Sequence, residues 1–251
     1  MTFQMWSIFH YLFIASPFIL AVIFFVVFKS KTYEEKRKIG IILSIIAIVV
    51  LLLRNIEILV KNNYIPNEEL IPLQICHFAN FVLLFAFLKD NKVLFALAFC
   101  LNLPAAMMSI IFANSLENYA TLFSFRAMAY LWGHLLIVAI TLWAVASGFV
   151  KITKQTLVKT MGLMVILYLF ALIINNVFNV LFGFNANYFY TISPESGTPL
   201  ELFFNWGKTY LIGWFKVNPL YMLLTSILGG IVVLGFFGLY KTVEPKIEAL
   251  R

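Results

Sequence analysis

Charged residues are scarce in this chain of 251 residues: they make up 12% of it, whereas hydrophobic residues make up 63%. That balance lies far outside the composition of soluble domains and excludes a soluble globular protein. The sequence also lacks a glycine- and serine-rich linker, a low-complexity tract and a nucleotide-binding glycine loop. We therefore expect one integral membrane domain over residues 1–251, with no second soluble domain and no cofactor.

Cysteine and histidine are rare as well, with two cysteines and three histidines in the whole chain. Both cysteines, Cys76 and Cys100, fall inside apolar runs. A disulfide between them is one alternative, but buried free thiols are the commoner arrangement. We therefore expect two free thiols.

Long apolar runs are what the sequence does contain, and seven of them are long enough to cross a hydrocarbon core of roughly 30 Å as helices. They cover residues 8–28, 40–60, 71–88, 93–112, 122–148, 157–182 and 220–240. Together with short connections they use nearly the whole chain. The sequence thus predicts an all-α, polytopic membrane helix bundle with seven transmembrane helices and an aromatic outer loop over residues 183–217.

Basic residues divide unevenly between the two ends of these helices. One side has only Lys61, Lys208 and Lys216. The other side has Lys29, Lys31, Lys36, Arg37, Lys38, Lys89, Lys92, Lys151, Lys154, Lys159, Lys241, Lys246 and Arg251. By the positive-inside rule this second side is cytoplasmic, which places the N-terminus outside and the C-terminus inside. The net charge of +7 therefore reflects topology and not a nucleic-acid partner, and we expect a multi-pass protein of the cell membrane.

Strongly polar residues inside a membrane are costly, so their positions are informative. On the expected topology, four helices carry such residues in the outer half of the membrane. These residues are Arg54 and Glu57 in the second helix, Gln74, Cys76, His77 and Asn80 in the third, Arg126, Tyr130 and His134 in the fifth, and Asn175, Asn176 and Asn179 in the sixth.

Helical spacing indicates which way these side chains point. Arg126, Tyr130 and His134 are four residues apart and form one stripe. Arg54 and Glu57 also share a face, where they can neutralise each other as a structural ion pair. The polar residues of the third helix share a little less than half of its circumference. The simplest packing turns all these faces toward one cavity that opens to the outer side, and this cavity is the candidate site.

A thiol becomes a nucleophile when a neighbouring base favours its thiolate, so a cysteine and a histidine on two helices are the minimal apparatus for acyl transfer. His77 follows Cys76 directly and is rotated about 100° around the helix, so it reaches the same sulfur poorly. His134 is the better base by geometry. A third, orienting group could come from Asn175, Asn179 or Glu57, and an oxyanion donor from Asn80 or Gln74.

Other interpretations stay open. Buried cysteines are commonly inert, and asparagine, glutamine and histidine often bridge membrane helices. Cys76, His77, His134 and Glu57 are zinc-ligand types, but the sequence has no HxxxH or CxxC pattern, and we expect no metal. A transporter, or a protein that binds a small polar or amphiphilic molecule, is the main rival. The absence of repeated, broken helices counts against it.

Four segments resemble, in order, landmark segments of the YwaF-like bacterial integral membrane proteins. They are "IPLQICHFANF", "LFALAFCLNLPAAMMSIIF", "YLWGHLLIVAITLW" and "LFGFNANYFYTISPESGTPLEL". That family is similar to a eukaryotic multispanning acyltransferase of ether phospholipids that uses a membrane cysteine and histidine. More distantly it is similar to lipid hydrolases of the androgen-induced type, which use a threonine and a histidine.

The resemblance implies roles for particular residues. The nucleophile position falls on Cys76, the base position on His134, and an Asn-Tyr landmark on Asn187 and Tyr188. Gln74 stands where the family has a histidine of its own. We therefore expect an enzyme that transfers or hydrolyses the acyl group of a membrane lipid through a thioester. The aromatic outer loop is expected either to cover the cavity mouth or to anchor in the membrane interface.

Overall fold

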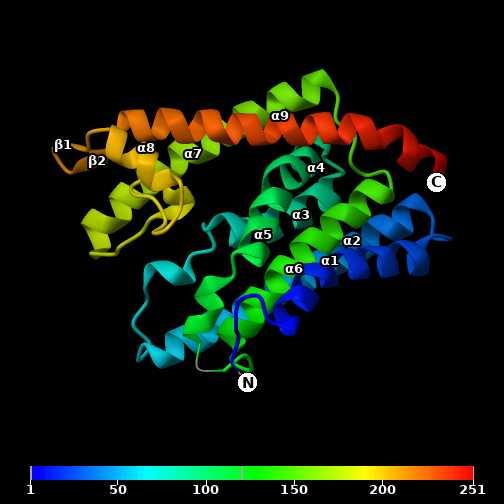
Figure 1. The fold of residues 1–251 in the computed structure, drawn as a ribbon, viewed down its shortest axis with the longest axis horizontal. Helices are drawn as coiled ribbons and strands as arrows, with labels where there is room; N and C mark the ends of the chain where they lie inside the picture. Colours follow the sequence, from blue (N-terminus) through cyan, green and yellow to red (C-terminus); the bar gives the residue numbers. More distant parts are fainter. Residues whose placement is uncertain (1, 120, 251) are drawn as a thin grey trace.

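The computed structural model describes residues 2–119 and 121–250, and this part of the chain is a bundle of helices (Figure 1). Seven of its helices are long and apolar enough to cross a membrane, which confirms the all-α, seven-helix expectation. They are α1 (Ile8–Phe28), α2 (Tyr33–Lys61), α3 (Ile75–Lys89), the fourth span described below, α6 (Phe125–Ala146), α7 (Lys154–Phe182) and α9 (Pro219–Leu250). The orientation of the bundle in the membrane stays a prediction.

The fourth span is not one regular helix. It consists of α4 (Lys92–Leu97), a π-helix η2 (Ala98–Asn102) and α5 (Leu103–Ile111). Pro104 in the first turn of α5 has no backbone N–H, so a regular α-helical hydrogen bond at that position cannot form. The wider π turn absorbs the interruption, because the N–H of Leu103 reaches back to the carbonyl of Ala98.

Helix α6 lies at the centre of the fold and packs against α1, α2, α3 and α5. Most of its residues are buried, and Trp143 near its C-terminal end is fully enclosed. The indole of Trp143 has the rings of Phe28 and Phe87 at centroid distances of 5.9 and 6.0 Å. The part of α6 from Leu135 to Ala146 is almost entirely apolar, as is expected of a helical segment buried on all sides.

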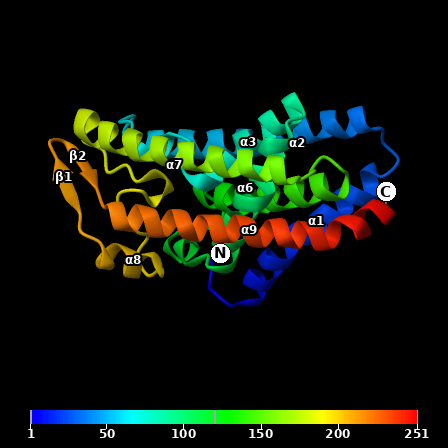
Figure 2. The same ribbon diagram turned by 90° about the horizontal axis from the view of Figure 1, so that it is seen from above.

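Helices α7 and α9 run side by side along the bundle (Figure 1 and Figure 2). The Tyr168 hydroxyl on α7 and the Thr225 hydroxyl on α9 join them at 2.6 Å. The pair meets the bundle mainly where α7 contacts α4 and α9 contacts η2. Most of their remaining surface is apolar and uncovered, as in helices that face lipid.

The segment between α7 and α9 has structure that hydrophobic periodicity missed. It contains the 3₁₀ turn η4 (Tyr188–Tyr190), the short helix α8 (Leu200–Trp206) and a hairpin of β1 (Tyr210–Ile212) with β2 (Phe215–Val217). The strands are antiparallel, with Tyr210 opposite Val217, and Gly213 turns the chain at a φ of 61°. Two further 3₁₀ turns, η1 (Glu68–Leu70) and η3 (Asn114–Asn118), lie outside this segment.

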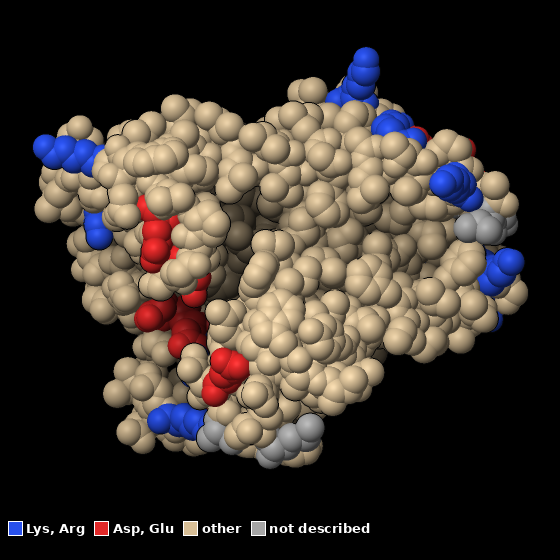
Figure 3. Space-filling view, viewed as in Figure 1, with Lys and Arg blue, Asp and Glu red and all other residues tan. Residues whose placement is uncertain are grey.

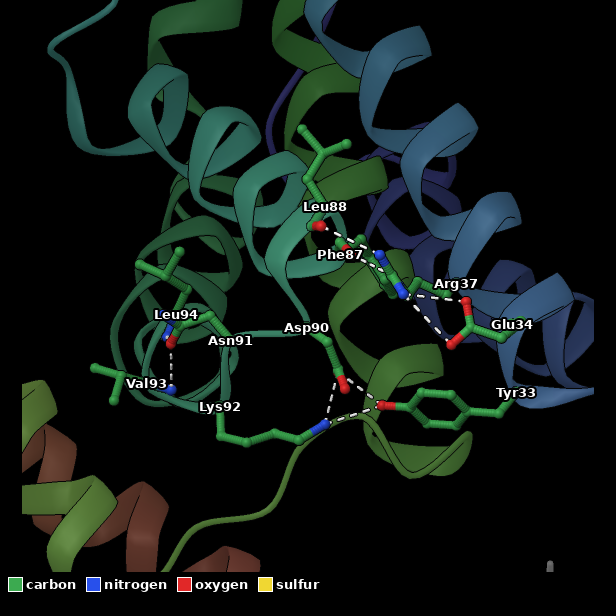
Figure 4. Close-up of polar contacts among 10 residues, drawn as sticks. All are labelled: Tyr33, Glu34, Arg37, Phe87, Leu88, Asp90, Asn91, Lys92, Val93 and Leu94. Carbon is green, nitrogen blue, oxygen red and sulfur yellow. Dashed lines mark hydrogen bonds and ion pairs between the residues drawn. The ribbon is translucent and has the colours of Figure 1, made fainter.

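A polar clasp ties the start of α2 to the α3–α4 turn at the end of the bundle predicted to be cytoplasmic (Figure 4). Arg37 donates from Nε to the carbonyl of Phe87 at 2.9 Å and from Nη2 to that of Leu88 at 3.2 Å, so it satisfies the last carbonyls of α3. Asp90 accepts from the Tyr33 hydroxyl and from Lys92 Nζ, both at 2.7 Å.

Candidate functional site

A cavity of about 80 Å³ lies between α2, α3 and α6. Its polar lining consists of Arg54, Cys76, His77, Asn80, Tyr119, Arg126, Tyr130 and His134. The sequence predicted a cavity at this place with all of these residues except Tyr119. At roughly 30 Å³ per water molecule, it has room for two or three waters or for one small polar group.

Cys76 and His134 meet in this cavity. Cys76 sits in the first turn of α3 and His134 in the middle of α6, and the thiol and the imidazole are electrostatic neighbours in the lining of the cavity. His134 Nδ1 lies 2.6 Å from the carbonyl oxygen of Tyr130, one turn earlier on the same helix. Since a carbonyl oxygen can only accept, Nδ1 carries the proton of the neutral ring. Nε2 is thereby left as the acceptor for the thiol proton.

Ser109 of α5 is a further neighbour of the thiol that the sequence interpretation missed. Its Oγ lies 3.8 Å from Cys76 Sγ and donates to the carbonyl of Ala105 at 3.2 Å. The backbone carbonyl of Ser109 accepts from the Tyr130 hydroxyl at 2.7 Å. Ser109 therefore holds both the thiol and the tyrosine. Its only sequence signal is its place in the landmark segment "MMSIIF".

Two polar groups in the cavity have unused hydrogen-bonding capacity. Asn80, one turn after Cys76, is 3% exposed, and its Oδ1 has no partner among the described residues. The same is true of Nδ1 of His77, whose electrostatic neighbours are Arg54 and His134. Buried polar atoms without partners are uncommon and mark places where a water or ligand group is bound.

The guanidinium groups of Arg54 and Arg126 lie on either side of one carboxylate. Glu69 in η1 accepts from Arg54 Nη2 at 3.0 Å and from Arg126 Nη2 at 2.6 and 2.8 Å. The expected pairing of Arg54 with Glu57 is therefore wrong. Glu57 instead pairs with Lys61 and accepts the backbone N–H of Arg126 at 2.8 Å, where it complements the N-terminal dipole of α6.

A sequence comparison places this cavity within a known family. The model of the TMEM164 family matches residues 5–237, which include every residue of the cavity lining. The chain belongs to the TMEM164 family. No curated protein and no solved structure matches the chain.

The TMEM164 family is a family of membrane acyltransferases, so the activity class expected from the sequence agrees with the family. The family match covers all seven candidate spans except the last part of α9. Both cysteines of this family member are free. Among the described residues, no group of three histidine, cysteine or acidic side chains is placed to hold a metal ion.

Several predicted site residues lie elsewhere in this TMEM164 family member. The side chains of Glu57, Gln74, Asn175, Asn176, Asn179, Asn187 and Tyr188 do not line the cavity. Gln74 is instead the residue that precedes the first turn of α3. The sixth predicted helix, which is α7 in the structure, contributes no residue to the lining. Tyr119, which follows η3, lines the cavity together with residues of α2, α3 and α6.

The asparagines of α7 hold in place residues 183–217, the outer segment of the predicted topology. Asn175 accepts from the backbone N–H of Tyr188 at 2.8 Å and donates to its carbonyl at 2.9 Å. Asn176 pairs in the same way with Lys216 of β2, and Asn179 with Ala186. Sequence spacing placed these amides on one helix, α7, but it could not show that backbone groups of the following loop would occupy them.

The segment around η4 reaches the site from outside the cavity. Phe189 packs on Phe78 of α3 at a ring-centroid distance of 6.1 Å, and Tyr190 is an electrostatic neighbour of Cys76 and Tyr130. The backbone of Phe189 and Tyr190 is left-handed, with φ values of 56° and 53°. This strained conformation is costly for residues other than glycine. Burial and the neighbouring Glu195 carboxylate raise the pKa of Tyr190 above its ordinary value.

Proposed function

We propose that the chain is a membrane enzyme that transfers or hydrolyses the acyl group of a lipid through a thioester on Cys76, with His134 as general base. One observation carries the proposal: a thiol and an imidazole are electrostatic neighbours in one polar cavity of a protein from a family of membrane acyltransferases. TMEM164 is the eukaryotic ether-lipid acyltransferase family. We assign this chain to a bacterial, YwaF-like branch of it.

In the first half of the reaction, Nε2 of His134 takes the thiol proton of Cys76. The resulting thiolate attacks the carbonyl carbon of the lipid ester, a C–S bond forms, and the carbonyl oxygen becomes an oxyanion. The C–O bond to the alcohol part of the lipid then breaks. This alcohol oxygen takes the proton from His134 and leaves, while the acyl group stays on the sulfur as a thioester.

In the second half, the hydroxyl of an acceptor lipid, or water, gives its proton to His134 and attacks the thioester carbonyl. The C–S bond breaks and the Cys76 sulfur recovers the proton. An acceptor lipid makes the reaction a transfer, whereas water makes it a hydrolysis. Both outcomes use the same two residues, because only the nucleophile of this half differs.

The surrounding groups fit supporting roles. The carbonyl of Tyr130 fixes the imidazole tautomer through Nδ1, the role that a third catalytic residue has in related triads. The amide of Asn80 can turn its Nδ2 group toward the oxyanion. Glu57, Asn175 and Asn179 are not available as orienting groups, because other partners occupy them.

The outer segment would both cover the mouth of the cavity and anchor in the membrane interface. Its first part, around η4, lies over the site and would exclude water from the thioester. Its second part carries exposed aromatic rings, with Trp206 64% exposed and Trp214 54% exposed. Exposed tryptophans beside a membrane helix are typical of an anchor in the interface.

The placement of the chain follows from the charge pattern. We propose a multi-pass protein of the plasma membrane, built as a single domain, with the N-terminus outside and the C-terminus in the cytoplasm. The cavity then lies in the outer half of the membrane, and its partner is a membrane lipid. No nucleic-acid role follows from the basic residues.

Transfer between defined lipids tests the proposal. Purified protein in vesicles would receive a phospholipid with a deuterated acyl chain and an acceptor lysophospholipid, and mass spectrometry would follow the label. Cys76→Ala and His134→Gln should each abolish transfer and release of the chain. Cys100→Ala is the matched control, because Cys100 is a buried thiol in η2 outside the cavity, and it should keep activity. Activity that survives Cys76→Ala contradicts the proposal.

A further inference from the structure

Two arginines share one carboxylate at the wall of the Cys76 cavity. Among the described residues, Glu69 is the acidic side chain that forms ion pairs with Arg54 and Arg126. Glu57 is paired with Lys61, and Glu195 lies near Tyr130 without an ion pair to either arginine. Two guanidinium groups thus compete for a single carboxylate in a region where an incompletely paired charge is costly.

The two arginines differ in how much of their hydrogen-bonding capacity is used. Arg54 is 9% exposed, and besides the Glu69 carboxylate it contacts the Glu69 carbonyl and Asn55 Oδ1, both at 2.9 Å. Arg126 reaches Glu69 through Nη2 alone, and its buried Nε has no partner among the described residues. Its side chain is 40% exposed. Arg126 is therefore the arginine with donors left for a ligand.

The unsatisfied donors point to an oxyanion. A guanidinium presents its N–H groups as a planar fork that matches phosphate and carboxylate oxygens. His77 lines the same cavity, and its Nδ1 also has no partner among the described residues. With Arg54, His77 and Arg126 in its wall, this cavity of about 80 Å³ suits a polar group of a lipid better than an acyl chain. In a membrane, the oxyanion that arrives attached to an acyl ester is the phosphate of a phospholipid.

Figure 3 shows acidic side chains beside a hollow in the molecular surface, with lysine and arginine side chains around them and toward the edges of the view. The acidic part of this face does not attract a phosphate. Recognition of an anionic group therefore has to depend on cations close to the site, and Arg54 and Arg126 line the cavity.

We infer that Arg126, with Arg54 behind it, binds the phosphate of the phospholipid whose ester reaches Cys76, and that Glu69 occupies these guanidinium groups when no lipid is bound. The inference rests on the proposed function. Lipid binding is then an exchange of anions, in which the phosphate displaces the Glu69 carboxylate from Arg126 while the Glu69 backbone carbonyl stays on Arg54. Arg126 and Glu69 set the specificity of the site and take no part in the proton transfers.

A binding experiment in a Cys76→Ala background tests this inference independently of any chemistry. The probes are a dialkyl glycerophosphocholine, whose ether chains cannot be transferred, the dialkylglycerol without its phosphate, and inorganic phosphate. Native mass spectrometry or a thermal-shift titration in detergent would measure binding. Arg126→Gln should weaken binding of the phospholipid at least about tenfold and leave the dialkylglycerol unchanged. Glu69→Gln, which removes the competing carboxylate, should strengthen it.

Two variants control for charge and folding. Lys208→Gln removes a positive charge from the same predicted side of the protein outside the cavity, and it should change nothing. Arg126→Lys keeps the charge without the fork and should bind with intermediate affinity. An equal loss of phospholipid and dialkylglycerol in Arg126→Gln would assign Arg126 a structural role and overturn the inference. So would inorganic phosphate binding as tightly as the phospholipid. Since the variants carry no thiol at position 76, these results stand even if no thioester forms.

Discussion

At the scale of single residues, three backbone carbonyl groups hold polar side chains of the candidate site in place by hydrogen bonds. Tyr130 orients His134, Ala105 orients Ser109, and Ser109 in turn holds the Tyr130 hydroxyl. Each of these contacts is local to one helix or joins two helices in direct contact. Such contacts hold a dyad rigidly, and rigid positioning is what acyl transfer requires of its nucleophile and base.

Gly133 offers a way to fill the cavity without changing the dyad. It lines the cavity on α6, and a Cβ placed on it would meet nothing within 4 Å. Gly133→Leu should therefore keep the fold and abolish lipid transfer, because the side chain enters the space that the substrate ester needs. Gly133→Ala should keep activity and raise stability by about 1 kcal/mol, the helix-propensity gain. A transfer assay and thermal unfolding would measure both. Full activity of Gly133→Leu would show that substrate does not enter this cavity.

That Cys76 and His134 line one cavity could be predicted from the sequence, whereas the ion cluster could not. Cys76 and His134 lie inside apolar runs, so their depth and helical face follow from counting residues. Glu69 lies in η1, before the regular part of α3, and a 3₁₀ turn has no periodicity that would predict its return over Arg54. The wrong pairing of Arg54 with Glu57 arose because the sequence showed only the partner on the same helix.

At the scale of elements, the ends of the helices depend on polar caps more than on hydrophobicity. The sequence placed the start of the second helix at residue 40, but α2 begins at Tyr33. Thr32 and Glu35 form a capping box there, with each side chain bonded to the backbone of the other. A search for apolar runs treats this charged turn as a loop. For the same reason, the charged residues at the end of α9 led the sequence analysis to end the last helix at residue 240, whereas α9 ends at Leu250.

The clasp of α2 with the α3–α4 turn depends on Asp90. Burial alone would raise the pKa of Asp90, but the hydrogen bonds from Lys92 and Tyr33 outweigh it and hold the pKa below its ordinary value of 3.8. Asp90→Asn should therefore lower the free energy of unfolding at pH 7 by about 1 kcal/mol, because the group is partly exposed. The unfolding temperature should fall accordingly. Because the pKa is depressed in the folded state, this contribution persists above pH 3.8 and is lost as the pH falls through the folded pKa.

Thermal unfolding in detergent at several pH values would measure this effect. The difference between Asp90→Asn and the parent should be constant from pH 7 to pH 5 and shrink below pH 3.8. Glu248→Gln, a change near the C-terminal end of α9, serves as a comparison. No difference at pH 7 would show that the clasp contributes nothing to stability.

At the scale of the whole molecule, the charge asymmetry predicts the orientation of the bundle. The test is labelling with a membrane-impermeant maleimide in intact cells, in a Cys76→Ala, Cys100→Ala background. Ser196→Cys lies in the exposed part of the outer segment and should be labelled, whereas Ser30→Cys in the α1–α2 turn should be labelled only after the cells are opened. The reverse pattern would place the cavity in the cytoplasmic half of the membrane.

The most direct test of the account is the detection of an acyl group on Cys76. Protein incubated with phospholipid vesicles would be digested and analysed by mass spectrometry, with and without hydroxylamine, which cleaves thioesters. The account predicts an acyl adduct on the peptide that contains Cys76, lost on hydroxylamine treatment and absent from the peptide that contains Cys100. In His134→Gln the adduct should not form. Active protein that transfers acyl chains while Cys76 stays unmodified at every time point would contradict the account.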